Sequence, residues 1–173
     1  MKNVQALVIA PQPFFTPRGT PFSVYYRTLV MSEMGIQVDL ITYGEGQDVD
    51  LPNVKIHRIP RFARLGTVKI GPSPLKLFLD FFLLLWTLRL LFKNKYDIVH
   101  AHEEAVFFCS LLKPVFGFKL IYDMHSSLPQ QLTNFKFTTS RLIIGCFEFF
   151  EEYALRKADA VITICPDLAD YVD

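Results

Sequence analysis

The stretches DIVHAHEE at residues 97–104 and KLIYDMHSS at residues 119–127 decide the fold. Each is a short, apolar run that ends abruptly in polar side chains. Buried strands of a parallel sheet are continuous apolar runs, and ligands of an open α/β sheet bind just beyond the carboxyl ends of its strands. We therefore expect two neighbouring strands to deliver four polar residues to one edge of a sheet: His102, Glu103, His125 and Ser126.

Outward from these stretches, strand-like and helix-like windows alternate along the chain. Strands are predicted at residues 4–10, 37–43, 54–59, 97–101, 119–124 and 160–165, and helices at residues 22–34, 75–93, 103–116 and 139–157. This alternation indicates right-handed βαβ crossovers. The sequence predicts an α/β fold, a Rossmann-like parallel sheet with helices on both faces, in one domain spanning residues 1–173.

Composition narrows the class of protein. A net charge of +1 argues against a nucleic-acid partner. The three cysteines form no C-x-x-C pair and are expected to be reduced, buried thiols in a cytoplasmic protein: Cys109, Cys146 and Cys165. The first ten residues do not fit a signal peptide, and no run reaches the roughly 18 apolar residues of a membrane span. We expect no metal, because the pair His100 and His102 lacks further ligands at a trusted spacing.

The loop PQPFFTPRGTP at residues 11–21 separates the first strand from the first helix. Backbone amides at a helix N-terminus bind anions, Gly19 permits a tight turn, and Arg18 has the reach to contact a phosphate or carboxylate. Neither G-x-G-x-x-G nor G-x-x-x-x-G-K-[ST] is present, which argues against classical dinucleotide and P-loop sites. A ligand-facing loop and an ordinary surface turn both remain open.

Residues 51–79 contain no Asp or Glu but six basic residues: Lys55, Arg58, Arg61, Arg64, Lys69 and Lys76. The helix predicted next, at residues 75–93, is apolar nearly all round. We expect one face to pack on the sheet (Leu77, Phe81, Leu84, Leu85, Leu88 and Phe92) and a second stripe to be left over (Leu79, Leu83, Trp86 and Leu90). Two interpretations stay open: peripheral contact with an anionic membrane through residues 55–92, or ordinary core beside a solvated loop.

Two features lie near the end of the chain. In the helix predicted at residues 139–157, three acids are expected to face solvent: Glu148, Glu151 and Glu152. Residues 166–173 resemble the opening of a further helix, with Pro166 in its first turn. We expect the sequence to be one half of a longer protein.

Four segments, in order, give the chain a family resemblance: residues 18–20 with 33–42, residues 96–103, residues 120–129 and residues 158–168. Together they resemble the N-terminal half of a GT-B glycosyltransferase of the large retaining family called group 1 or family 4. The resemblance spans nearly the whole chain. It departs from the family in the first loop, where two glycines are common and Gly19 stands alone.

The resemblance implies an acceptor-binding domain that faces a C-terminal, donor-binding domain absent from this chain. His125 matches the family's histidine against the donor sugar, which implies a catalytic role. Arg18, Gly19, Thr20, His102, Glu103 and Ser126 are the implied substrate-binding residues. The implied reaction moves a sugar from a nucleotide-sugar donor, without a cofactor, to a cell-envelope polysaccharide or glycolipid. This fits a cytoplasmic protein, peripheral on the inner face of the membrane.

Two other functions are compatible with these residues. One is a Rossmann-like module that binds a ligand without chemistry. The other is a GT-B nucleotide-sugar epimerase, which uses the same two-domain architecture.

Overall fold

A computed structural model describes residues 4–17, 19–62, 66–68, 71, 73–134 and 140–172. Its elements, in chain order, are β1 (Gln5–Ala10), α1 (Gly19–Glu33), β2 (Gln37–Thr42), β3 (Val54–Arg58), α2 (Pro74–Lys93), β4 (Ile98–His102), α3 (Ala105–Phe116), β5 (Lys119–Met124), α4 (Leu128–Asn134), α5 (Arg141–Lys157), β6 (Ala160–Thr163) and α6 (Pro166–Val172). Every strand and helix window expected from the sequence is present. The short α4 is an addition that the sequence pattern did not predict.

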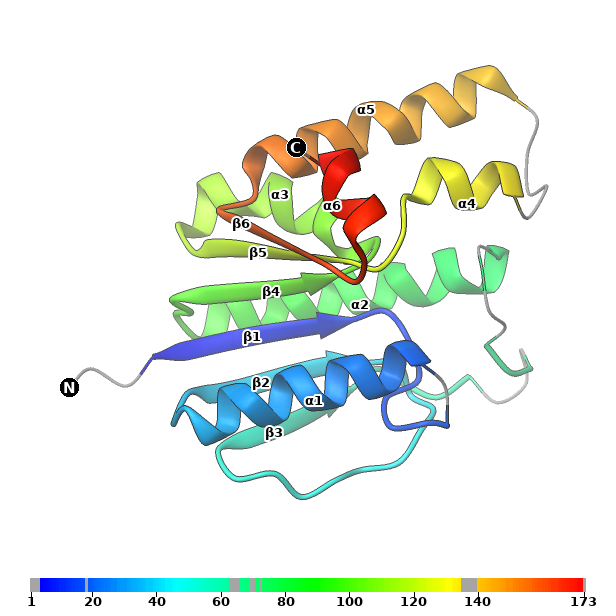
Figure 1. The fold of residues 1–173 in the computed structure, drawn as a ribbon. Helices are drawn as coiled ribbons and strands as arrows, with labels where there is room; N and C mark the ends of the chain where they lie inside the picture. Colours follow the sequence, from blue (N-terminus) through cyan, green and yellow to red (C-terminus); the bar gives the residue numbers. More distant parts are fainter. Residues whose placement is uncertain are drawn as a thin grey trace.

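The six strands form one parallel sheet in the order β3-β2-β1-β4-β5-β6. The chain reverses its direction of progress across the sheet between β1 and β4, so this is the topological switch point at which open α/β sheets bind ligands. Helices cover both faces: α1 and α6 lie in front of the sheet in Figure 1, with α2 and α3 behind it. The predicted Rossmann-like fold is confirmed.

Alternation along the strands divides the core between the two faces. On β1, Leu7 and Ile9 belong to the larger core, behind the sheet, while Ala6, Val8 and Ala10 belong to the smaller core beneath α1. Successive side chains of a strand point to opposite faces, which explains this split.

The orientation predicted for α2 is wrong. The stripe expected to be left over is the one that packs inward, with Leu79, Leu83 and Leu90 buried, whereas Leu77 and Phe92 are 59% and 78% exposed. Thr87 lies on the buried face and satisfies its hydroxyl by donating to the carbonyl oxygen of Leu83 at 2.9 Å. Among the described residues, no helix combines the length and apolarity that crossing a membrane requires.

Two further expectations fail near the C-terminal part of the chain. Glu151 of α5 is 1% exposed rather than solvent-facing. Of the three cysteines, Cys109 is buried as expected, but Cys146 and Cys165 are exposed.

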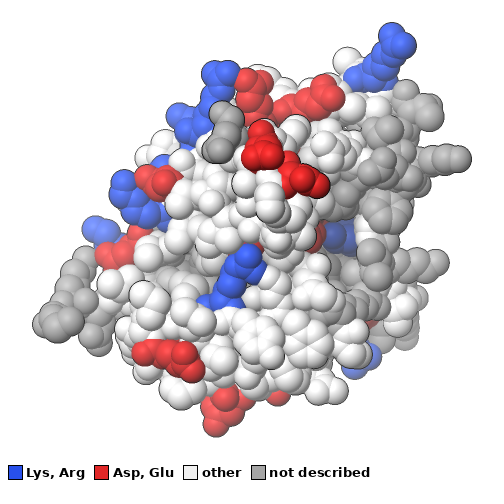
Figure 2. Space-filling model, in the orientation of Figure 1, with Lys and Arg blue, Asp and Glu red and all other residues white. Residues whose placement is uncertain are grey.

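α1 also leaves an apolar stripe uncovered, with its members four residues apart: Phe22, Tyr26 and Val30 on the helix and Met34 just after its end. The surface over α1 is largely uncharged in Figure 2, with acidic groups gathered instead over α5 and α6.

The loops that follow β1 and β2 are held together by a close backbone approach. Phe14 bridges Gly46, and the Gln47 N–H donates to the Phe14 carbonyl oxygen at 3.1 Å. Gly46 has φ +106°, and a Cβ at this position would lie 1.9 Å from that same oxygen. Only glycine fits a left-handed conformation at such a contact.

Candidate functional site

The carboxyl ends of β4 and β5 bring the predicted site residues together. His102 is the last residue of β4 and pairs with Asp123 of β5, and His125 follows the end of β5 directly. The His102 and His125 ring centroids are 5.8 Å apart. The two imidazoles therefore lie at one edge of the sheet, as expected from the sequence.

Asp123 lies at the centre of this edge, in what we call the Asp123 cluster (Arg27, His100, His102, Asp123 and His125). Its Oδ2 is 2.6 Å from Arg27 Nε, 3.0 Å from His100 Nε2 and 3.4 Å from His102 Nδ1. Its Oδ1 is 3.1 Å from His125 Nε2. The Asp123 side chain is fully buried, so its charge is neutralised by these neighbours rather than by water.

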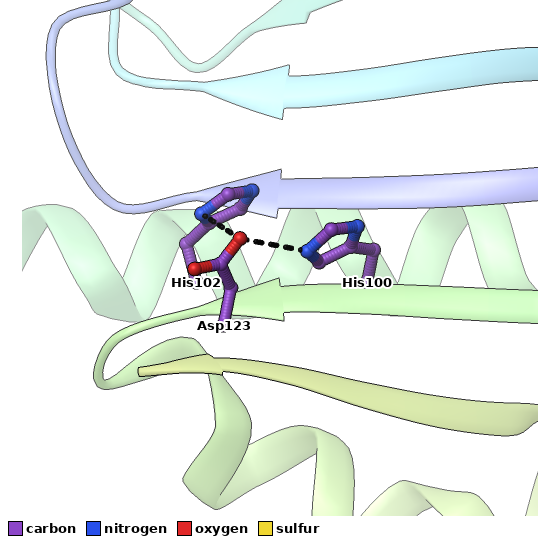
Figure 3. A group of neighbouring side chains, drawn as sticks. All are labelled: His100, His102 and Asp123. Carbon is purple, nitrogen blue, oxygen red and sulfur yellow. Dashed lines mark hydrogen bonds and ion pairs between the residues drawn. The ribbon is translucent and has the colours of Figure 1, made fainter. Parts of the chain in front are cut away.

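Strand geometry explains why this cluster forms on the α1 side of the sheet. His100 and His102 are two residues apart on β4, so they point to the same face, and their rings stack 4.7 Å apart at 7°. Asp123 on β5 points to that face as well (Figure 3). Arg27 reaches the carboxylate from the middle of α1, with 24% of its side chain exposed.

The surroundings of Asp123 and His102 within the Asp123 cluster determine their protonation states. Burial alone would raise the pKa of Asp123, but its contacts with His100 and His125 hold that pKa well below the ordinary range. Burial, followed by the neighbouring His100, lowers the pKa of His102 well below its usual value. At neutral pH Asp123 is therefore a carboxylate and His102 a neutral imidazole.

The ligand atoms of His100, His102 and Asp123 lie within 4.8 Å of one another, which is close enough for a metal. Arg27 Nε, however, occupies the same carboxylate oxygen that both histidines face. A guanidinium there repels a second cation and already uses the oxygen. The donor set therefore fits an ion pair between the arginine and the aspartate better than it fits a metal.

A second group of charges lies on the opposite, α2–α3 side of the same edge, and we call it the acidic cluster (Asp80, Glu103 and Glu104, with Lys76 and Tyr43). Lys76 Nζ is 2.5 Å from Glu104 Oε1, and the Tyr43 hydroxyl donates to Asp80. Glu103 adopts φ 47°, a conformation that non-glycine residues rarely take, and its N–H donates to the Asp123 carbonyl oxygen at 3.0 Å.

Burial and crowding perturb the acidic cluster. Burial, then the charge of Glu104, raises the pKa of Glu103 to about 7 and that of Asp80 to about 8. Burial alone would lower the pKa of Lys76, but Glu104 and Glu103 keep it above the ordinary value. At pH 7 the Asp80 carboxyl is mostly protonated and can donate a hydrogen bond.

The other predicted site residues are placed less directly. Gly19 and Thr20 form the first turn of α1, beyond the end of β1 and at the same edge of the sheet (Figure 1). Arg18 lies outside the described residues. Ser126 is half-buried and follows His125.

Two important residues were not found from the sequence. Arg27 was missed because nothing local marks a mid-helix arginine as the partner of a distant aspartate. Glu151 was taken for a surface acid, yet it accepts from Ser127 Oγ at 2.8 Å, from the Leu128 N–H at 2.9 Å and from the Tyr171 hydroxyl at 2.9 Å. This buried carboxylate fixes the segment immediately after His125 and ties it to α5 and α6.

The fold and this edge of the sheet define a class: the N-terminal, Rossmann-like half of a GT-B glycosyltransferase. The sequence model of Glycosyltransferase Family 4 matches residues 18–173, and the chain belongs to that family. A search of curated protein sequences gives no match.

Solved structures agree on the fold. Sucrose-phosphate synthase from Thermosynechococcus elongatus is similar with a TM-score of 0.70 at 16% identity, over 98% of this chain and 44% of the synthase. A second, twinned crystal structure of that synthase, from a shorter chain, gives a TM-score of 0.63 at 16% identity, over 97% of this chain and 80% of the other. This chain thus spans less than half of the first synthase chain.

Proposed function

We propose that this chain is the acceptor-side domain of a retaining glycosyltransferase. The complete enzyme transfers a sugar from a nucleotide-sugar donor, without a cofactor, to a cell-envelope polysaccharide or glycolipid. The observation that carries the proposal is the meeting of His102 and His125 around the buried Asp123, at the switch-point edge of a family domain. A companion C-terminal domain across this edge supplies most of the donor site.

His125 is the residue to which we assign the catalytic role. Its side chain is 8% exposed and is oriented by Asp123, so its ring is held in one position before substrate arrives. A positioned imidazole can hydrogen-bond a sugar hydroxyl and stabilise positive charge as the glycosidic bond breaks. Most of the remaining work is to position the sugar and stabilise the departing phosphate, to which the first turn of α1 at Gly19 and Thr20 contributes backbone amides.

His102 and Glu103 are assigned to the acceptor. His102 is fully buried and neutral, so its effect on the acceptor passes through the ring of His125 and through the shape of the edge. Glu103, with its raised pKa of about 7, offers a carboxyl that changes between donor and acceptor of hydrogen bonds near neutral pH.

Residues 55–92 are proposed to contact the membrane, but two of the basic residues expected to take part are paired within the protein. Arg58 donates to Asp48 and to the carbonyl oxygens of Glu45 and Gln47, and Lys76 pairs with Glu104. Lys55 and Arg61 are exposed and, with the outward apolar face of α2, remain for such a contact on the inner face of the membrane. Arg64 and Lys69 lie outside the described residues.

The test is His125→Ala in the full-length protein, compared with His57→Ala as a matched control on β3. The full-length protein is incubated with a panel of nucleotide sugars, and released nucleoside phosphate is measured with and without acceptor extracts. We expect His125→Ala to lower kcat at least about a hundredfold and His57→Ala to leave it within about twofold. Equal rates for the wild type and His125→Ala contradict the proposal.

A further inference from the structure

An apolar groove of about 550 Å³ lies between α2, α3, α4 and α5. Nine of its lining residues are apolar, and four of these are phenylalanines: Leu77, Phe107, Phe108, Leu111, Leu128, Leu132, Ile143, Phe147 and Phe150. Small-molecule sites usually occupy roughly 300–1,000 Å³ and are lined mainly by apolar and aromatic side chains. The groove therefore has the size and lining of a ligand site.

The lining is open to solvent where the helices do not meet. Leu77, Leu111 and Ile143 are 59%, 52% and 43% exposed, although they come from three different helices and line one groove. Contact between these apolar side chains and water is unfavourable, and an apolar ligand in the groove would remove it.

The polar residues of the groove are gathered at one end. Ser73, Lys76 and Asp80 come from the N-cap and first turns of α2, and Glu104 immediately precedes α3. α3 begins at the carboxyl edge of the sheet, directly after Glu103 and Glu104, and α2 begins beyond the same edge (Figure 1). The groove is thus continuous with the acidic cluster, and through it with the edge where we place the sugar transfer.

The charges at this end select the kind of head group. Lys76 is already paired with Glu104 at 2.5 Å, so no free cation of the acidic cluster faces the groove to hold a phosphate. The raised pKa of Asp80 favours its protonated form, which can donate a hydrogen bond to a sugar hydroxyl, and the Glu104 carboxylate can accept one. An amphiphile with a hydroxyl-rich head and an apolar chain matches both ends.

We infer that this groove binds the hydrocarbon chain of a glycolipid acceptor, with the sugar head at Glu103 and Glu104. This rests on the proposed function, and it chooses the glycolipid over the polysaccharide as the acceptor. In this arrangement the hydrocarbon chain of the lipid lies between the helices and its sugar head lies at the edge of the sheet. The lipid then does not have to leave the membrane completely.

The test measures binding of alkyl β-D-glucosides of increasing chain length, each below its micelle concentration, to the full-length protein without donor. Affinity should rise up to about fourfold for each added methylene. Ile143→Asp, inside the groove, should abolish this dependence on chain length. Leu142→Asp, its 83% exposed neighbour outside the groove, should retain it, and thermal unfolding checks that both variants are folded.

Equal affinity for the hexyl and decyl glucosides overturns the inference, as does an unchanged dependence on chain length in Ile143→Asp. A change in oligomeric state on Ile143→Asp, without any chain-length dependence, would assign the groove to a second copy of the chain and also overturn it. Because no sugar is transferred in this assay, its failure is separate from a failure of the His125→Ala test.

Discussion

The ion pair between Arg27 and Asp123 allows the most direct test of the described site. Asp123→Asn keeps the shape of the side chain but removes the charge that Arg27 faces at 2.6 Å. Breaking a buried ion pair costs roughly 3–5 kcal/mol. Because a quarter of the Arg27 side chain is exposed, water solvates part of the orphaned cation, and we expect the lower end, about 3 kcal/mol.

For a domain of this size a loss of about 3 kcal/mol lowers Tm by roughly 6–12 °C, measured by calorimetry or circular dichroism. A double-mutant cycle with Arg27→Met separates the pair from the histidines, and we expect a coupling of roughly 1–3 kcal/mol. The exposed pair of Glu152 and Arg156 is the control, with a coupling of about 0.3–0.5 kcal/mol.

The same cycle has a predicted dependence on pH. The folded-state pKa of Asp123 is depressed, so its stabilising contribution is present above the unfolded pKa of about 3.9 and is lost as the pH falls below it. The difference between wild type and Asp123→Asn should be constant from pH 5 to 8 and shrink below about pH 4. Additive effects of the two substitutions, within about 0.5 kcal/mol, would refute the assigned ion pair.

Two further predictions concern buried acids. The pKa of Asp80 is raised to about 8, so the folded protein holds a proton that the unfolded chain releases, and stability falls as the pH rises from about 4 to 8. Asp80→Asn, which still accepts from Tyr43, should gain at least about 1 kcal/mol over wild type between pH 5 and 9 in urea unfolding; a constant difference would contradict this. Glu151→Gln should cost about 2 kcal/mol, because its amide group cannot accept from every donor that the carboxylate satisfies, including the Leu128 N–H. The same measurement on the exposed Glu152→Gln should change by less than about 0.5 kcal/mol, and equal losses in the two variants would count against the buried network.

The sheet and the meeting of the two histidines could be predicted because both depend on local patterns. The runs that became β4 and β5 are mostly apolar and β-branched before they end in polar residues, and parallel strands that end in polar residues share one edge. The same reasoning could not orient α2, since a helix that is apolar nearly all round has no polar face to mark the solvent side. Its buried face even contains Thr87, which hides its hydroxyl in a bond to its own helix.

What the sequence did not reveal depends on contacts between distant segments. Arg27 and Asp123 are joined only when α1 folds over the switch point, and Glu151 becomes buried only when α4, α5 and α6 meet around it. α4 is seven residues long and begins with Leu-Pro, too short for a helical period to be visible. The local sequence therefore does not show whether a polar residue in a helix is exposed to solvent or belongs to a buried hydrogen-bond network.

The tight passage at Gly46 has a practical consequence for anyone who wishes to re-engineer substrate preference. Since the carbonyl of Phe14 sits where a larger residue would need room, the turn after the second strand dictates where the turn after the first can rest. The two turns therefore cannot be exchanged independently of each other. Grafting one turn from another enzyme without its partner should displace the backbone of the binding surface, whatever side chains the graft carries.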